Sequence, residues 1–286
     1  MANSGKLKGS AAIEDALRRA KMALDQGHAA EAEQIAESVL EREPRHAGAL
    51  QLLGGALLLQ ERFEEAIAPL EGAARVLRDA SLDTQLAIAL RESGRDEDAL
   101  ARLKRAVKRE PPYVFAFHEL GYLLFTLKRY DEAIAAIERG IEIAPLTTNL
   151  FVLLGSICHA RNDLPRARAA FARALDISPQ LVSAHYGIGA TLMLEGAYKP
   201  AIEHFRVASM SDPTDQQARL KLAGCLLEAG DTEAALTLLR AVVQGDRKGY
   251  LTSLKVVQSS GRGRFWLRPS AAARALAQDR AGASKG

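Results

Sequence analysis

Residues 114–147 read VFAFHELGYLLFTLKRYDEAIAAIERGIEIAPLT, and this stretch decides the fold. In its first half, Phe117, Leu120 and Leu124 recur at helical spacing. A second apolar run begins at Ala133 and stops close to Pro145, which cannot continue a helix. The segment therefore predicts two short helices joined by a turn.

The same pattern recurs along the chain at a nearly constant interval. The alanine that opens the second run has counterparts at spacings of 34, 33, 34, 34, 34 and 34 residues, namely Ala32, Ala66, Ala99, Ala133, Ala167, Ala201 and Ala235. Twelve residues before each of them the chain always has Gly or Ala, at Ala20, Gly54, Ala87, Gly121, Gly155, Gly189 and Ala223. Two columns of small residues allow paired helices to approach closely. Because one hairpin cannot bury its own apolar face, the hairpins must stack on one another.

The break between the two helices is marked by glycine in four of these units. Gly27, Gly94, Gly196 and Gly230 suit the left-handed conformation that ends a helix. Alanine is abundant, with 52 residues, and only 5% of the chain is aromatic. Both figures are consistent with packing through close contacts of small residues.

On these residues the chain resembles the tetratricopeptide repeat family. The match is strongest in Phe117, Gly121, Ala133, Ile137 and Pro145, and the next unit repeats it from Phe151 to Pro179. The resemblance implies an all-α fold, a right-handed α-solenoid of stacked helix-turn-helix hairpins. Seven repeats fit the sequence: 13–46, 47–79, 80–113, 114–147, 148–181, 182–215 and 216–246.

Some positions depart from the family pattern. Arg19 and Ala23 stand where the first repeat should have large apolar residues, which suggests an atypical capping repeat. Asp83 replaces a large residue in the third repeat, and Arg78 replaces the terminal proline of the second. These departures concern local packing.

Outside the repeats, we expect a flexible N-terminus over 1–12, a capping helix over 247–260 and a basic C-terminal tail over 261–286. The capping helix would cover the end of the stack with Tyr250, Leu251, Leu254 and Val257. The net charge of +3 combines two unlike parts. Residues 1–246 carry 29 Lys and Arg against 34 Asp and Glu, whereas residues 247–286 carry nine basic residues against one Asp.

The N-terminal residues lack an apolar stretch of signal-peptide length, so no signal peptide is expected, and two cysteines in a chain of this size are not expected to form a disulfide framework. The longest uncharged stretch, residues 143–160, is interrupted by polar residues and a proline, so a membrane span is not expected. We therefore expect a cytoplasmic protein.

A second stripe on the first helices of repeats four to six predicts a binding groove. At helical spacing this stripe lies on a different face from the core stripe. Its residues are Phe115, His118, Tyr122, Phe125, Val152, Ser156, His159, Tyr186 and Met193. We expect them to bind an apolar or amphipathic peptide or helix of a partner protein. The alternative is that the rings only pack neighbouring repeats.

The C-terminal tail provides a further set of contact candidates. Arginines alternate with the aromatic residues of one short segment, at Arg262, Arg264, Phe265, Trp266 and Arg268. Such a segment can contact an acidic partner, the acidic repeats of the same chain or, less expectedly, nucleic acid or a membrane.

Nothing in the sequence resembles an enzyme site, and no cofactor or metal is expected. Phosphate-binding loops, paired cysteines and metalloprotease motifs are all missing. We therefore expect a non-catalytic adaptor that binds a protein or peptide in the concave groove of its repeats. The alternative function is an accessory module that recruits an enzyme on another chain, such as a glycosyltransferase or a sulfotransferase.

Overall fold

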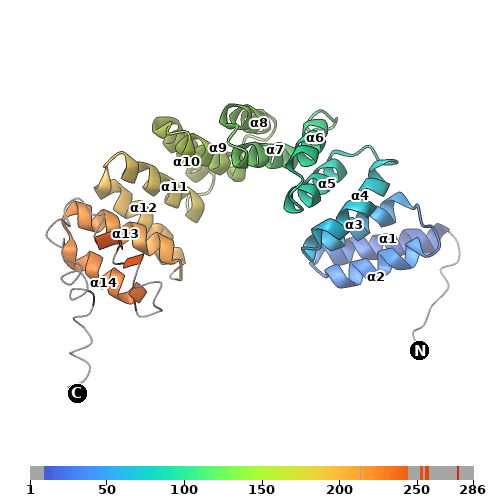
Figure 1. Cartoon of the computed structure of the whole chain (residues 1–286), viewed down its shortest axis with the longest axis horizontal. Helices are drawn as coiled ribbons and strands as arrows, with labels where there is room; N and C mark the ends of the chain where they lie inside the picture. Colours follow the sequence, from blue (N-terminus) through green and yellow to red (C-terminus); the bar gives the residue numbers. More distant parts are fainter. Residues whose placement is uncertain (1–9, 213, 244–251, 254, 258–275, 277–286) are drawn as a thin grey trace, which may run out of the picture. The chain divides into compact units, whose positions relative to one another are not determined.

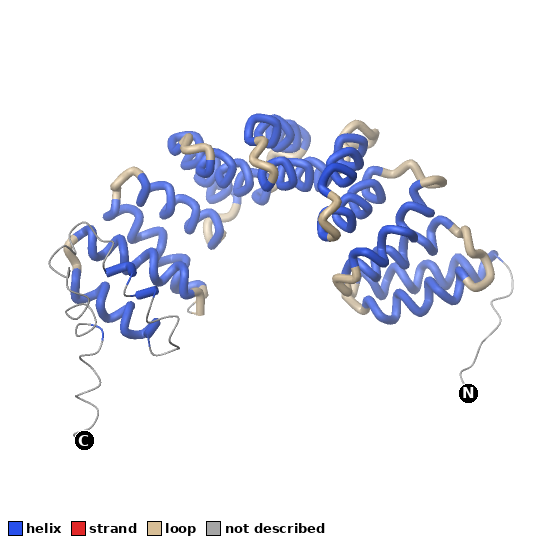
Figure 2. The backbone as a smooth tube through the Cα atoms, viewed as in Figure 1, coloured by secondary structure: helices blue, strands red, loops and turns tan. Residues whose placement is uncertain are grey.

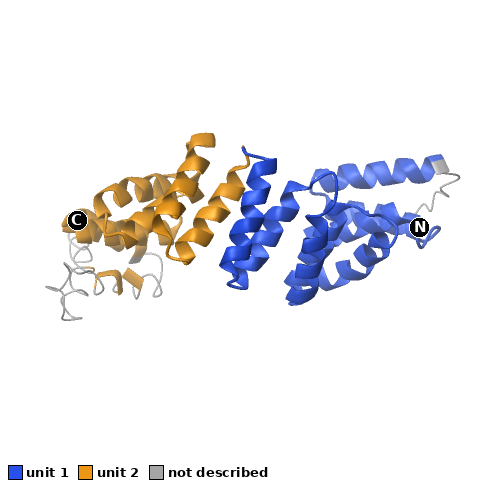
Figure 3. Ribbon diagram, turned by 90° about the horizontal axis from the view of Figure 1, so that it is seen from above, with its two compact units in different colours: residues 1–145 blue, residues 146–286 orange. Residues whose placement is uncertain are grey.

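The computed structural model describes residues 10–212, 214–243, 252–253, 255–257 and 276. Helices joined by short turns make up this part of the chain, and it contains no strand (Figure 2). The fold is therefore all-α, as predicted. The chain divides into two compact units, residues 1–145 and residues 146–286 (Figure 3).

Unit 1 consists of four antiparallel helix pairs that follow one another along the chain (Figure 1). The first and second helices of each pair are α1 (Ser10–Asp25) with α2 (Ala29–Leu40), α3 (Ala47–Leu59) with α4 (Phe63–Ala74), α5 (Ala80–Glu92) with α6 (Asp96–Ala106), and α7 (Val114–Thr126) with α8 (Tyr130–Ile143). The first helix of each pair also contacts the first helix of the next pair. Unit 1 therefore has one face built from first helices.

Unit 2 repeats this arrangement with three further pairs. They are α9 (Thr148–Ala160) with α10 (Leu164–Ile177), α11 (Val182–Leu194) with α12 (Tyr198–Ser211), and α13 (Gln216–Ala229) with α14 (Thr232–Val243). Each of the seven predicted repeats contains one helix pair, except that α1 begins at Ser10. Residues 10–12, which the sequence prediction assigned to a flexible N-terminus, belong to this helix.

The Gly and Ala column allows the two helices of a pair to lie in close contact. A Cβ atom added at Gly54 would come within 2.4 Å of the Leu70 side chain, and one at Gly121 within 2.4 Å of Ile137. Both partners lie on the second helix, sixteen residues later. Large residues of the second helix therefore fill the space that the missing side chains leave.

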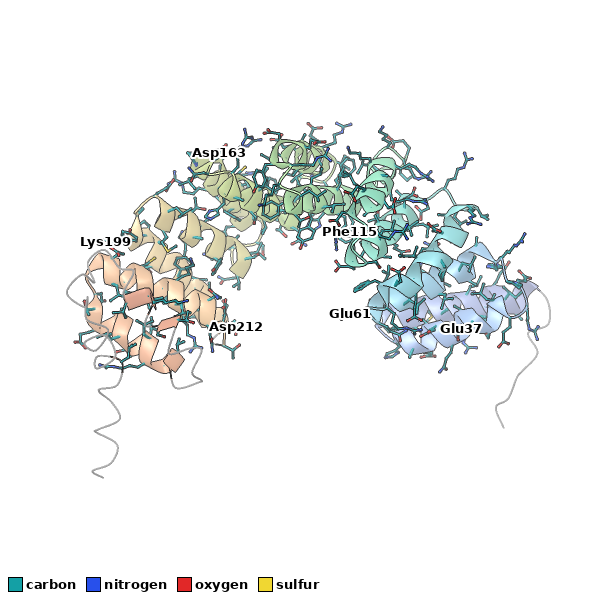
Figure 4. All side chains as sticks on the ribbon, in the orientation of Figure 1. Glu37, Glu61, Phe115, Asp163, Lys199 and Asp212 are labelled. Carbon is teal, nitrogen blue, oxygen red and sulfur yellow. The ribbon has the colours of Figure 1, made fainter. Side chains whose placement is uncertain are left out.

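The turn that follows the first helix contains one residue with positive φ in all seven repeats. Glycine occupies four of these positions, at Gly27, Gly94, Gly196 and Gly230, as predicted. The other three positions hold Glu61, Lys128 and Asn162, with φ of 59°, 60° and 65° (Figure 4 labels Glu61). Residues with a Cβ are strained in this conformation.

We expect Lys128→Gly to stabilise unit 1 by about 1 kcal/mol, because glycine adopts the left-handed conformation without steric cost. Urea denaturation of the two proteins measures the difference. Asn162→Gly is the matched comparison in unit 2, and its gain should be smaller because asparagine tolerates this conformation better than lysine. A loss of stability in Lys128→Gly would contradict this account.

The departures from the family pattern have different structural outcomes. Ala23 is buried beside Ala32 and Ala56, so a small residue fits the first repeat. Asp83 is buried and contacts three arginines.

The described part of the predicted capping helix lies against α13 and α14 of the same unit. Ser253 and Val257 are buried, and Val256 lies beside Gly224 of α13. Tyr250, Leu251 and Leu254 are outside the described residues.

Candidate functional site

Four of the sequence-predicted groove residues lie on α7, in unit 1. Phe115 and Tyr122 are 44% and 40% exposed (Figure 4 labels Phe115). The His118 ring stacks on the Phe115 ring, with centroids 5.8 Å apart. The Tyr113 ring meets the Phe115 ring edge-on, with centroids 6.1 Å apart. We call Tyr113, Phe115, His118 and Tyr122 the aromatic patch.

An ionic network lies next to the aromatic patch. The Glu119 carboxylate accepts hydrogen bonds from Arg91 of α5 at 2.6 Å and from His118 Nδ1 at 3.0 Å. Burial opposes ionisation of Glu119, but these hydrogen bonds outweigh it and hold the pKa of the carboxyl below its usual value. The Arg91 guanidinium also lies 5.0 Å from the centre of the Tyr122 ring, a cation–π contact. The network therefore fixes α5 against α7 and orients two rings of the patch.

Phe125, the fourth predicted residue of α7, has a different environment. Its ring lies 6.1 Å from the ring of Tyr130, at the start of α8. Phe125 is half-buried and packs within its own hairpin. Much of its surface is therefore used in the fold.

In unit 2, three predicted residues line one pocket of about 950 Å³. Val152 and Ser156 come from α9 and Tyr186 from α11. The loop between α10 and α11 closes one side of the pocket, and Asp215 and Gln217 border it at the start of α13. The other lining residues are Phe171, Ser178, Gln180, Leu181, Val182, Ser183 and Gly187.

Most of the accessible surface of this pocket is apolar, although seven of its lining residues carry polar side chains. Tyr186 meets the buried Phe205 edge-on, with ring centroids 5.5 Å apart. Burial, and then the charge of Asp215, raises the pKa of the Tyr186 hydroxyl, which therefore stays protonated at neutral pH. Asp215 Oδ1 caps α13 by accepting from the backbone N–H groups of Gln217 and Ala218.

The last two predicted residues, His159 and Met193, do not line this pocket. His159 Nδ1 is 3.1 Å from Thr191 Oγ1, and burial followed by the charge of Lys221 lowers the pKa of this histidine. Met193 borders a smaller pocket of about 260 Å³, together with Leu220, Lys221 and Val256. The predicted stripe thus contributes to several surfaces, each described within its own unit.

A pocket on the first helices of unit 1 was not predicted. It has a volume of about 430 Å³ and lies on the first helices α1, α3 and α5. Its lining residues are Lys21, Leu24, Asp25, Gln51, Leu52, Gly55, Leu58, Leu59 and Gln85. The signal for it is the exposed Leu59 beside several other leucines of α3.

The remaining site predictions concern metals, membranes and the tail. Within the described ranges, no three His, Cys, Asp or Glu residues are placed to hold a metal ion. None of the helices that the structure describes is long and apolar enough to cross a membrane. The tail candidates Arg262, Arg264, Phe265, Trp266 and Arg268 lie outside the described residues.

Stacked helical hairpins with a face of first helices define a helical-repeat protein. Two family models, both described as tetratricopeptide repeat, match the sequence. One matches residues 23–87 and 192–255, and the other matches 84–147, 145–182 and 160–213. The chain therefore belongs to the tetratricopeptide repeat family.

Solved structures of the same fold are distant in sequence. The C-terminal part of a TPR repeat-containing protein from Cytophaga hutchinsonii is 14% identical, with a TM-score of 0.66 over 82% of this chain and 98% of that chain. A chain of the APC/C hetero-tetramer Cut9-Hcn1 is 14% identical, with a TM-score of 0.65 over 83% of this chain and 48% of that chain. YrrB, described as a TPR protein with an unusual peptide-binding site, is 18% identical, with a TM-score of 0.52 over 64% of this chain and 95% of that chain. No curated protein sequence matches the chain significantly.

Proposed function

We propose that the chain is a non-catalytic adaptor that binds an apolar or amphipathic segment of a partner protein on the first-helix faces of its repeats. The observation that carries the proposal is the pocket of about 950 Å³ in unit 2, since Val152, Ser156 and Tyr186 line it. Clefts of this size with a mostly apolar lining are typical ligand sites. The proposal places this function in the cytoplasm.

The chemistry of the lining favours an apolar segment with a few polar groups. Of the described residues that line the pocket, Asp215 alone is acidic and none is basic. Ser183 and Gln217 offer hydrogen-bonding groups beside the apolar Val152 and Leu181. A helix or extended segment can bury apolar side chains here while its polar groups face the rim. The peptide-binding site described for YrrB gives the same function a precedent in this fold.

The aromatic patch of unit 1 is the second surface included in the proposal. Exposed Tyr and Phe rings supply large contact areas at low entropic cost and are enriched at protein interfaces. Because the Arg91–Glu119 ion pair orients Tyr122, this surface is ordered before a partner binds.

A peptide selection tests the proposal for the pocket. Peptides are selected from a random phage-displayed library against the full chain, and their affinities are measured by calorimetry. We expect Ser156→Trp to weaken binding at least about tenfold, because the indole fills the pocket that an anchoring side chain would enter. Circular dichroism checks that the variant keeps its helical content.

Ala169→Trp is the matched control, since Ala169 is exposed on α10, a second helix. It should leave affinity unchanged. A second pair of variants, Phe115→Ala and Tyr122→Ala, reports on the aromatic patch in the same assay. If no peptide is selected, or if every selected peptide binds all four variants as tightly as the natural chain, the proposed function is wrong.

A further inference from the structure

Two histidines in unit 2 connect the loop of the large pocket to the neighbouring hairpin. His185 of α11 and His204 of α12 face each other, with their Nδ1 atoms 3.0 Å apart. The other ring nitrogen of His185, Nε2, is 3.0 Å from the Pro179 carbonyl oxygen. Pro179 lies between Ser178 and Gln180, both of which line the pocket. The pair thus joins this loop to α12.

The hydrogen atoms of this arrangement follow from its acceptors. The Pro179 carbonyl oxygen only accepts, so His185 Nε2 must carry a proton and donate it. A neutral imidazole carries one proton, which leaves His185 Nδ1 as an acceptor. His204 Nδ1 must therefore be the donor of the 3.0 Å bond. In the neutral pair, His185 Nε2 and His204 Nδ1 are therefore donors and His185 Nδ1 is an acceptor.

Protonation changes this arrangement in two steps. The first proton can bind His204 Nε2 and leaves both hydrogen bonds in place, but it puts a charge on a half-buried ring. When His185 is protonated as well, its Nδ1 carries a hydrogen and can no longer accept from His204 Nδ1. Two cationic rings with opposed N–H groups then repel each other at this distance.

The surroundings provide little compensation for the added charge. Glu203 of α12 acts on His204, but it is also paired with Arg206 at 3.1 Å. Asp176 of α10 is paired with Arg173. The neighbouring α11 carries no charged residue besides His185, with Tyr186 as its other titratable group. Two charged residues come from α13 and its cap. Asp215 borders the large pocket, and Lys221 borders the smaller one.

His159 of the same unit provides an internal contrast. Thr191 Oγ1 donates to the Gly187 carbonyl at 2.8 Å, so it accepts from His159 Nδ1. Protonation at His159 Nε2 therefore leaves that bond intact. Among the histidines of unit 2, loss of a hydrogen bond on full protonation is therefore specific to the His185–His204 pair.

We propose that the His185–His204 pair is a proton-sensitive link between α12 and the 178–181 loop, which it fixes at neutral pH. In acid the His185 ring, repelled by His204, moves away from α12 together with its Pro179 contact, which displaces the loop and reshapes the large pocket. This inference rests on the proposed function only for its effect on ligand binding. The movement of the loop stands by itself.

The direction of the pKa shift agrees with this geometry. Burial, and then the neighbouring His185, lowers the pKa of His204, whereas Glu203 opposes the shift. The folded state therefore binds this proton less readily than the unfolded state does. The resulting contribution to stability is complete above about pH 6.5 and is lost as the pH falls toward and through the lowered value.

Amide hydrogen exchange in the full chain tests the link. The Leu181 N–H donates to the Ser178 carbonyl, so its protection reports on the closed loop. We expect its protection factor, corrected for intrinsic exchange, to fall about tenfold between roughly pH 7.5 and 5, the change that one pKa unit of coupling gives. In His204→Gln the amide can still donate to His185 but does not titrate, and the fall should be less than about threefold. His159→Gln is the control and should behave like the natural chain.

The outcomes separate the two proposals. An unchanged protection factor in the natural chain, or an equal fall in His204→Gln, would show that the pair does not hold the loop. A peptide selected for the pocket should also bind about tenfold more weakly at the lower pH, and not in His204→Gln. If the loop opens but the affinity stays constant, control of the pocket is refuted while the proposed function stands. If no peptide binds even at neutral pH, the proposed function fails and the exchange result alone decides the link.

Discussion

Gly155→Ala should destabilise unit 2 by about 2 kcal/mol, although alanine favours a helix more than glycine does. A Cβ at Gly155 would come within 2.7 Å of the Phe171 ring. The same ring also lies close to the α11 backbone, since a Cβ at Gly187 would come within 2.5 Å of it. Phe171 is also almost completely buried. The new methyl group must therefore displace the α9 or α10 backbone.

Gly224→Ala is the matched control on α13. Among the described residues its added Cβ would meet only Val256, at an ordinary distance of 3.7 Å, so we expect stabilisation by about 0.5–1 kcal/mol. A smaller side chain at position 171 should relieve this contact. We therefore expect Gly155→Ala combined with Phe171→Leu to lose less stability than the two single changes added together. Urea denaturation of the four variants measures these values. A stable Gly155→Ala protein would show that Phe171 has room to adapt.

The fold was predictable because its stabilising contacts recur at a fixed interval. In four repeats the small residue of the first helix is a glycine that faces a large residue of the second helix, as Gly121 faces Ile137. A period of about 34 residues makes this pairing visible without any structure. The positive-φ position shows the limit of such reasoning. Glycine marks it in four repeats, but nothing in the residue type of Glu61 or Lys128 indicates a left-handed conformation.

The candidate site was predictable only in part. Helical spacing identifies the face on which Phe115, Ser156 and Tyr186 lie, and the structure finds all three accessible. Spacing does not show that Phe125 packs against Tyr130, because that contact depends on the turn between the two helices. The loop residues of the pocket and the Glu119 network are also missed. They arise from contacts between hairpins, for which the repeat pattern has no signal.

Asp83→Ala has the largest effect that we expect, a destabilisation of unit 1 by about 3 kcal/mol or more. Asp83 is 1% exposed, at a position where the family has a large residue. Arg109 Nε donates to its Oδ2 at 2.6 Å, and Arg102 and Arg105 lie 3.7 Å from its Oδ1. Removing the carboxylate leaves a cavity and three convergent cations, of which Arg109 is largely buried. Urea denaturation should show the loss, and high salt should restore part of it by screening the cations.

A double replacement separates the two causes of this loss. In Asp83→Leu with Arg109→Leu, the buried charge pair is exchanged for apolar side chains that match the family pattern at position 83. Replacing a whole buried ion pair in this way is often neutral or stabilising, so we expect stability within about 1 kcal/mol of the natural chain. Asp83→Leu alone should remain destabilised, because Arg109 keeps its charge and loses its partner. If the single and double variants are equally unstable, the carboxylate contributes something other than neutralising these arginines. If Asp83→Ala is as stable as the natural chain, the arginines are solvated well enough without a counter-charge.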